Sequence, residues 1–220
     1  ATTEIYTLSL HDALSISSAY GANGAMPYRE DARADHQLSF YAATKKATEN
    51  MAHSYAHLYG LPITMSRFFT VYAPWGRPDM AHFKFTRAIL DGAPVDVYNH
   101  GDMRRDFTYI DDLTAAIVAL IDTVPGDAPV TGDSLSPVAP HRVINIGNGA
   151  PVPLMDFIAA IERACGRTAI RTFHDMQPGD VPATWADTTL LETLTGKRPA
   201  TPIQTGIDAF VAWYRAYYRI

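Results

Sequence analysis

Residues 39–69 read SFYAATKKATENMAHSYAHLYGLPITMSRFF, and this stretch predicts the fold class. Apolar side chains recur at roughly helical spacing across residues 39–59. Ser39 can cap the start of this helix, and Gly60 can end it. Residues 63–69 form a short apolar and aromatic run that is typical of a buried strand. A helix followed closely by such a strand is half of a βαβ unit, which implies a parallel sheet.

The rest of the chain continues to alternate between helix and strand. We expect further helices at 83–90, 111–122, 154–165, 188–194 and 205–218, with Asp111 capping the second of these. We expect strands at 95–98, 105–109, 143–146 and 170–173. The segments 73–79 and 124–141 contain the Pro and Gly residues of loops. The sequence is therefore that of an α/β protein.

The composition excludes several classes of protein. The 220 residues are 47% hydrophobic and 19% charged, as in a globular protein with an ample core. A net charge of −5 gives no basic patch for DNA or RNA. No run of 18 apolar residues predicts a membrane span. The single cysteine, Cys165, cannot form an internal disulfide, which favours a cytoplasmic location.

Tyr41 and Lys45 are four residues apart on the first predicted helix, so their side chains share a face. A free tyrosine is a poor base at neutral pH, and a nearby ammonium group favours its phenolate form. Such a pair can take the proton from a sugar hydroxyl while a cofactor accepts a hydride. The same spacing also occurs by chance in many helices, so the spacing alone leaves a purely structural role open.

The motifs around this pair narrow the choice. The helix motif is preceded by Ser17-Ser18-Ala-Tyr-Gly21 and followed by Arg67-Phe-Phe-Thr-Val-Tyr72. In this order the motifs resemble the extended short-chain dehydrogenase/reductase family, the NAD-dependent nucleotide-sugar epimerases and dehydratases. The resemblance runs from Ser17 to the C-terminus. It implies a partial Rossmann-like, doubly wound parallel sheet, a smaller α/β lobe that binds the sugar nucleotide, and NAD as cofactor.

The resemblance also implies roles for individual residues. Tyr41 matches the catalytic base, and Lys45 matches its partner, which also holds the nicotinamide ribose. Ser18 or Ser17 matches the residue that hydrogen-bonds the reacting hydroxyl, and the sequence leaves that choice open.

The residues after the first strand match the family's nicotinamide and sugar contacts. Phe68 and Phe69 occupy the positions that meet the nicotinamide, and Thr70 the position that faces the sugar. Without the resemblance, these three residues are equally those of a buried strand end.

Trp75-Gly-Arg-Pro-Asp79 makes the sequence most similar to the UDP-glucuronate 4-epimerases within this family. A carboxylated sugar needs a cation that can make paired, charge-assisted contacts, and Arg77 is suited to that task. The alternative is a solvated loop arginine. Ala73 stands where the family usually has Gly, so we expect a small adjustment of a turn that needs positive φ.

The nucleotide half of the substrate is matched by residues of the second lobe. Val97 and Tyr98 match positions that pack on uracil, and Arg105 matches an arginine that binds the diphosphate. Lys84 is expected to add to this charge. Gln177 and Asp180 match a loop that closes over the uridine, with Asp180 accepting from the ribose hydroxyls.

The beginning of the chain is unusual. Residues 1–16, ATTEIYTLSLHDALSI, lack an initial Met and the pattern of a secretory signal. They resemble translated sequencing adaptors, so we expect a non-native leader; the alternative is a native strand and turn. Residues 17–72 are expected to be the C-terminal part of the NAD-binding domain, and 73–220 mainly the substrate lobe with some segments returning to the sheet. The Gly-rich seat for the pyrophosphate is then absent, and we expect the chain alone to be inactive.

For the parent enzyme, an isomerase, the resemblance implies reversible conversion of UDP-glucuronate to UDP-galacturonate through a 4-keto sugar, and a homodimer. The rivals within the family are a UDP-glucose 4-epimerase, a UDP-glucuronate decarboxylase and a sugar-nucleotide dehydratase. A non-catalytic protein that binds nucleotide sugars is the rival from another class.

Two other patterns are predicted not to be functional sites. His53, His57 and Glu49 share a helix face but have no fourth ligand, so we expect polar residues on a solvent face and no metal. Gly147-Asn-Gly149 follows a strand but lacks the third glycine of a dinucleotide fingerprint, so we expect a turn.

Overall fold

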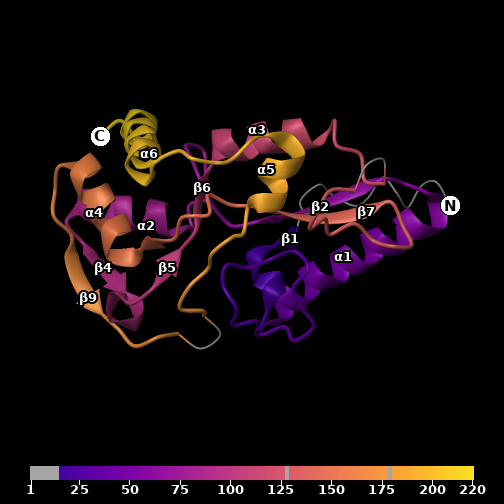
Figure 1. Ribbon diagram of the computed structural model, residues 1–220. Coiled ribbons are helices and arrows are strands. Elements are labelled where there is room, and N and C mark those ends of the chain that lie inside the picture. Colours follow the sequence, from indigo (N-terminus) through magenta and orange to yellow (C-terminus); the bar gives the residue numbers. More distant parts are fainter. Residues whose placement is uncertain (1–14, 127–128, 178–179) are drawn as a thin grey trace, which may run out of the picture.

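The computed structural model describes residues 15–126, 129–177 and 180–220, which form two lobes side by side (Figure 1). We call them the sheet lobe, which contains α1, and the smaller lobe, which contains the C-terminal helix α6. Residues 1–14 of the expected leader lie outside the described residues.

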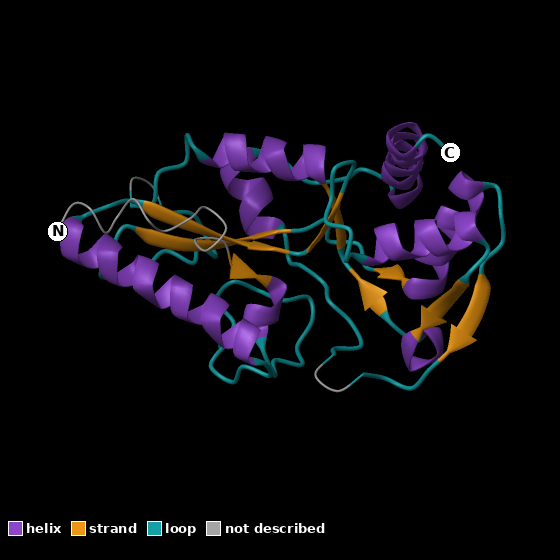
Figure 2. Ribbon diagram, turned by 180° about the vertical axis from the view of Figure 1, so that it is seen from behind, coloured by secondary structure: helices purple, strands orange, loops and turns teal. Residues whose placement is uncertain are grey.

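A parallel three-stranded sheet forms the centre of the sheet lobe, in the order β1 (Ser15–Ile16), β2 (Ile63–Phe68) and β7 (His141–Ile146). The helices of this lobe are α1 (Phe40–Tyr59), α3 (Ile110–Leu120) and α5 (Thr189–Thr195). α1 covers one face of the sheet, while α3 and α5 cover the other (Figures 1 and 2). Helices on both faces of a parallel sheet confirm the predicted α/β class.

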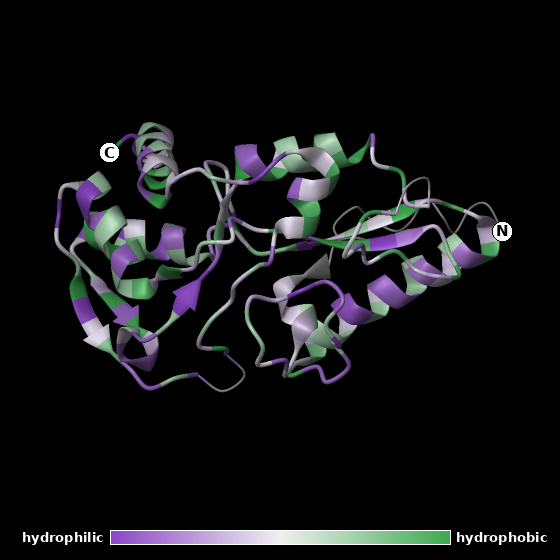
Figure 3. Cartoon of the chain, viewed as in Figure 1, coloured by the Kyte–Doolittle hydropathy of each residue, from purple (hydrophilic) through white to green (hydrophobic). Residues whose placement is uncertain are grey.

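Local signals in the sequence set the ends of α1. The Ser39 side chain accepts a hydrogen bond of 3.1 Å from the backbone N–H of Ala42, and Gly60 ends the helix at φ +63°. Ala42 and Ala56 are buried against the sheet lobe. The hydropathy colours alternate along this helix, as expected for an element with one packed face (Figure 3). The helix predicted from residues 39–59 is therefore confirmed.

The elements of the smaller lobe are α2 (Ala81–Asp91), β4 (Pro94–Val97), η3 (Tyr98–Gly101), α4 (Leu154–Cys165), β9 (Ile170–Phe173) and α6 (Ile203–Tyr218). In this lobe, α2 packs on α4 and on the two-stranded parallel sheet of β4 and β9, and α6 packs on α4. Phe157, Ile161 and Phe210 are fully buried in the core of the lobe. α4 and β9 have the predicted bounds.

Short strands connect the lobes. They are β3 (Thr70–Tyr72) parallel to β6 (Phe107–Tyr109), and β5 (Arg104–Arg105) antiparallel to β8 (Val152–Pro153). The single strand predicted at 105–109 is therefore wrong, because Asp106 interrupts it. The fully buried Asp106 carboxylate accepts hydrogen bonds of 2.8–3.0 Å from the backbone N–H groups of Asn148, Gly149 and Ala186.

The predicted cap of α3 is also wrong. Tyr109 occupies the N-cap position without a side-chain cap, and Asp111 lies in the first turn. The neighbouring Asp112 accepts hydrogen bonds from the backbone N–H groups of Ala200 and Thr201. This carboxylate therefore joins α3 to the segment before α6.

The sequence predicted that the polar face of α1 lies in solvent, and this prediction is wrong. Glu49 is only 2% exposed and binds Arg67. His53 hydrogen-bonds Ser136, and His57 hydrogen-bonds the Val138 carbonyl, so the loop before β7 packs on this face. Among the described residues, no group of His, Cys, Asp and Glu side chains is arranged to hold a metal. No helix in the same residues has the length and hydropathy needed to cross a bilayer.

Candidate active site

A cavity of about 210 Å³ lies where the two lobes meet. It brings together five of the residues predicted for the site: Ser17, Ser18, Thr70, Arg105 and Asp180. These residues come from four separate parts of the chain, so their convergence depends on the tertiary fold. The start of α1 closes one side of the cavity through Leu38, Ser39 and Ala42.

Tyr41 and Lys45 lie at this end of α1. Residues on both sides of Tyr41 line the cavity, and the Tyr41 side chain is 53% exposed. The Lys45 ammonium lies over the Tyr41 ring, 5.7 Å from its centroid. Neither side chain is itself among the residues that line the cavity.

The two candidate serines differ in their surroundings. Both belong to the short 3₁₀ helix η2 (Ser17–Tyr20) and both line the cavity. The Ser18 hydroxyl oxygen is buried and has no hydrogen-bond partner among the described residues. A buried hydroxyl without a partner is unfavourable, and a ligand hydroxyl would satisfy it. This observation favours Ser18 over Ser17.

The side chains between the end of β2 and the start of β3 lie in two different surroundings. Thr70 lines the cavity, as the site hypothesis requires. Phe69 is buried beside Tyr28 in a cluster of aromatic residues at the base of η2. Phe68 packs on the opposite side, with the core beneath α3 and α5. Phe69 and Thr70 are therefore near the cavity, whereas Phe68 faces away from it.

Arg105 and Asp180 are paired with each other. The Arg105 Nη2 atom lies 2.9 Å from Asp180 Oδ1, and Arg105 Nη1 donates to the carbonyl of Arg104. Burial lowers the pKa of Arg105, which the Asp180 carboxylate partly offsets. The sequence predicted separate roles for these two residues. A diphosphate that binds Arg105 must therefore compete with Asp180 or share the guanidinium with it.

Nine of the fourteen predicted residues do not line this cavity: Tyr41, Lys45, Phe68, Phe69, Arg77, Lys84, Val97, Tyr98 and Gln177. Val97 is fully buried in the core of the smaller lobe, so it offers no surface to a base. Tyr98 packs on His174 with ring centroids 5.3 Å apart. Lys84 is exposed on α2, and Gln177 is exposed beside residues that lie outside the described part.

Arg77 lies in the loop before α2 and its side chain is 72% exposed. Its Nε atom donates to Asp79 at 3.0 Å. This hydrogen bond raises the pKa of Arg77, with a smaller contribution from Tyr41. The expected strain at Ala73 is absent; Trp75 instead has a positive φ, +62°.

The structure reveals a buried polar network that the sequence did not predict. Arg67 forms two hydrogen bonds to Glu49, of 2.7 and 2.8 Å, and lies over the Tyr20 ring. The Tyr20 hydroxyl donates to Asn145 at 2.6 Å, and burial raises the pKa of Tyr20 to about 12. The network connects α1, β2, β7 and η2. An arginine within a predicted buried strand was the available signal, because such a charge requires a partner.

Glu30 adjoins this network. Its carboxylate accepts a hydrogen bond of 2.9 Å from the backbone N–H of Asn145. Burial raises the pKa of Glu30 to about 7. No sequence pattern distinguished this residue.

Gly147-Asn-Gly149 does not have free amides for a phosphate. The backbone N–H groups of Asn148 and Gly149 both donate to Asp106. A protein carboxylate therefore already occupies the place of an anion, and the segment serves as the turn that was predicted.

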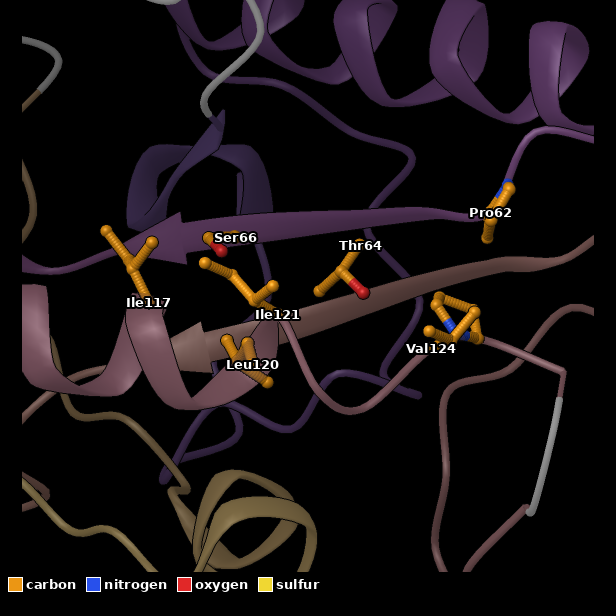
Figure 4. Close-up of a pocket in the computed structure, with 8 residues that line it drawn as sticks. Pro62, Thr64, Ser66, Ile117, Leu120, Ile121 and Val124 are labelled. Carbon is orange, nitrogen blue, oxygen red and sulfur yellow. The ribbon is translucent and has the colours of Figure 1, made fainter.

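A larger hollow of about 400 Å³ lies elsewhere, between β2 and α3 (Figure 4). Ile117, Leu120 and Ile121 of α3 face Thr64 and Ser66 of β2 across it. None of its described lining residues is titratable, so we assign no chemistry to it.

Comparison with known proteins shows the family of the chain. The model of the NAD dependent epimerase/dehydratase family matches residues 5–147. A probable UDP-glucuronate 4-epimerase of Rhizobium meliloti (strain 1021) is 54% identical over 210 residues, which cover 93% of this chain and 62% of that protein. UDP-glucuronate 4-epimerase 4 of Arabidopsis thaliana is 46% identical over 208 residues, which cover 93% and 47%.

Solved structures show the same similarity. UDP-glucuronic acid 4-epimerase from Bacillus cereus, in complex with UDP-glucuronic acid and NAD, superposes with a TM-score of 0.80 at 31% identity, covering 93% of this chain and 61% of that one. The chain spans 62–63% of the length of the first curated relatives that it matches.

Proposed function

Because the chain belongs to the NAD dependent epimerase/dehydratase family, we propose that the whole protein interconverts UDP-glucuronate and UDP-galacturonate. The reaction inverts the sugar carbon C4 through a 4-keto intermediate. The relatives named UDP-glucuronate 4-epimerase support this substrate. The observation in the structure that carries the proposal is the cavity between the lobes, which joins Ser18, Thr70 and Arg105 to the end of α1 that bears Tyr41.

Three residues take part in proton transfer at the reacting carbon, C4. The Tyr41 phenolate accepts the proton of the C4 hydroxyl, and the Lys45 ammonium stabilises that phenolate. The Ser18 hydroxyl, which lacks a partner among the described residues, hydrogen-bonds the same sugar oxygen. Tyr41 and Lys45 would hold the nicotinamide ribose of NAD, which would supply the acceptor and the donor of the C4 hydride. Tyr41 then gives its proton back to the C4 oxygen.

The chain's residues fit the nicotinamide end of NAD. The Tyr41 and Lys45 side chains are close together on the end of α1 that borders the cavity, and Phe69 packs on Tyr28, which lines it. The described residues include no Gly-rich turn with free amides for the pyrophosphate, because Asp106 occupies those of the 147–149 turn.

The remaining predicted residues bind the substrate in this proposal. Arg77 contacts the sugar carboxylate, and Thr70 contacts the sugar. Arg105 binds the diphosphate after exchanging its bond to Asp180, which becomes free to accept from the ribose hydroxyls. Arg77, Lys84, Tyr98 and Gln177 do not line the cavity, so their roles require a substrate that extends beyond it.

We propose a cytoplasmic homodimer, in keeping with a buried free cysteine and the exposed apolar side chains of Met51 and Leu58 on α1. Cross-linking of the whole protein at low concentration tests the dimer.

Activity of the whole protein tests the proposed function. Tyr41→Phe is expected to reduce the formation of UDP-galacturonate by at least about a hundredfold, since general acid–base catalysis contributes that much. Tyr59→Phe, on the same helix and outside the cavity, is the control and should be as active as the wild type. A Tyr41→Phe protein with unchanged turnover would refute the assignment of the base.

Substrate selectivity separates the proposal from a UDP-glucose 4-epimerase. Arg77→Ala should lower kcat/KM for UDP-glucuronate by about tenfold or more, because it removes a charge-assisted contact, and should leave turnover of UDP-glucose unchanged. Equal losses for both sugars would show that Arg77 does not recognise the carboxylate. Release of CO₂ from UDP-glucuronate would instead identify a decarboxylase.

The presence of Arg105 and Asp180 in the cavity favours a second function, binding of nucleotide sugars without catalysis. Calorimetric binding of UDP without dependence on NAD, together with absent turnover in the whole protein, is the result that this function predicts.

A further inference from the structure

The loop that carries Arg77 is held from two sides, although Arg77 itself is exposed. In the described part of the chain, its guanidinium pairs only with Asp79, which belongs to the same loop. An ion pair inside a loop cannot fix that loop relative to the rest of the protein. The position of Arg77 relative to Tyr41 therefore depends on what holds the loop backbone.

Trp75 holds the loop to the C-terminal helix. Its ring centroid is 5.1 Å from that of Trp213 and 5.2 Å from that of Tyr217, both on α6. Trp213 and Tyr217 are themselves stacked, with centroids 5.3 Å apart. We call these three residues the aromatic clamp. The clamp joins a loop to a helix that lies far from it in sequence.

The backbone of Trp75 is in a conformation that is unfavourable for its residue type. Its φ of +62° lies in the left-handed region, which a bulky residue rarely adopts. The side chain is nevertheless 73% exposed, so burial of apolar surface does not explain the strain. Strain of this kind persists where surrounding contacts impose it, and it is common at ligand sites. The rings of α6 provide those contacts.

The first turn of α2 supports the loop from the other side. A Cβ atom on Gly76 would lie 2.9 Å from His82 Nε2 and 3.1 Å from the Ala73 carbonyl oxygen, so the backbone rests directly on the His82 ring. His82 is 2% exposed and packs on Phe210 of α6, with centroids 4.6 Å apart. Burial lowers the pKa of His82 to about 4, so the ring is neutral at pH 7.

We propose that Trp213 and Tyr217 are positioning residues that fix the Arg77 guanidinium for the sugar carboxylate by holding Trp75. The inference rests on the proposed function, because it concerns the same substrate. It assigns part of the selectivity for an acidic sugar to α6, which contributes no residue to the cavity.

The test compares equilibrium binding of UDP-glucuronate and UDP-glucose to the full chain by calorimetry. Tyr217→Ala removes one side of the clamp from a residue that is 54% exposed, so the fold is retained. We expect the preference for UDP-glucuronate to fall by about tenfold, the size of one charge-assisted contact, with UDP-glucose binding unchanged. Trp213→Leu should have the same effect, and Trp213→Phe should restore the preference because it keeps an aromatic ring.

Tyr218→Ala is the matched control. Tyr218 is exposed on the same helix and packs on Tyr214 and Tyr217, with no ring contact to Trp75. The Tyr218→Ala variant should bind both sugars as the wild type does. An equal loss of preference in Tyr218→Ala and Tyr217→Ala would overturn the inference, since it would indicate a general effect on α6.

Failure of the inference can be told apart from failure of the proposed function. If Arg77→Ala loses the preference and both Tyr217→Ala and Trp213→Leu keep it, the clamp is not a positioning device and the proposed substrate stands. If the wild-type chain shows no preference for UDP-glucuronate, the substrate proposal and this inference are both overturned.

Discussion

The α1 side of the sheet lobe and the interior of the smaller lobe contain side chains of different character. Behind α1, Arg67 is bound to Glu49, and both side chains are 2% exposed. The core of the smaller lobe is instead aromatic and aliphatic, and Phe157 stacks on Phe107 with centroids 4.2 Å apart.

This difference corresponds to the part of the candidate site that each lobe positions. Hydrogen-bonded ion pairs have directional geometry, so the Arg67–Glu49 pair fixes the rotation of α1 and with it Tyr41 and Lys45. Packing of apolar side chains adapts more readily to small changes. The smaller lobe therefore positions the Arg77 loop through ring contacts, which adjust to a substrate more easily than a buried charge can.

The largest loss of stability is expected from the exchange of one carboxylate oxygen for an amide nitrogen in the polar interior. Glu49→Gln keeps the shape of the side chain but leaves Arg67 buried without a counter-charge. We expect the free energy of unfolding to fall by about 3–5 kcal/mol, measured by urea denaturation. Lys46→Met, which removes the outer cation paired with Glu49, is the control and should change it by less than about 1 kcal/mol. A loss below about 1 kcal/mol in Glu49→Gln would show that the charge of the pair does not hold α1.

Glu30 allows the polar interior to be tested by pH. Its pKa is raised by burial from 4.5 to about 7, so the folded state binds the proton more tightly than the unfolded state. The contribution to stability is complete below pH 4.5 and is lost as the pH rises to about 7, a change of roughly 3 kcal/mol.

The measurement is the difference in urea midpoint between wild type and Glu30→Gln from pH 5 to pH 8. His82 and His141 have pKa values lowered to about 4, so they act in the opposite direction, and the difference between the two proteins isolates Glu30. Glu30→Gln should match the wild type at pH 5 and exceed it in stability at pH 8. A difference that does not vary with pH contradicts the burial of this carboxyl group.

The sequence predicted the elements whose signals are local. α1 has its cap at Ser39 and its stop at Gly60, and α4 and β9 are bounded by equally local breaks, so their ends were found. β3 and β8 were missed because strands of two or three residues show no periodicity. The break at Asp106 depends on amides contributed by segments about 40 and 80 residues further along, which no window of sequence contains.

The candidate site was also predicted only in part. Family motifs identified Ser18, Thr70, Arg105 and Asp180, and the fold brings these four into one cavity. Their pairing was not predictable, since the bond between Arg105 and Asp180 joins residues 75 positions apart. The contact of Trp75 with α6 escaped prediction for the same reason, and Val97 was misplaced because a motif does not show which side of a strand is buried.

The smallest loss of stability is expected in the apolar interior, from a change that removes one heavy atom. Ile161→Val deletes a methyl group from a fully buried residue of α4. We expect the free energy of unfolding to fall by about 0.5–1.5 kcal/mol, because neighbouring side chains relax into part of the space. Binding of UDP-glucuronate should not change, since Ile161 makes none of the ring contacts that hold the Arg77 loop. If Ile161→Val destabilises the protein as much as Glu49→Gln does, the two interiors are equally intolerant, and the contrast between directional and adaptable positioning is lost.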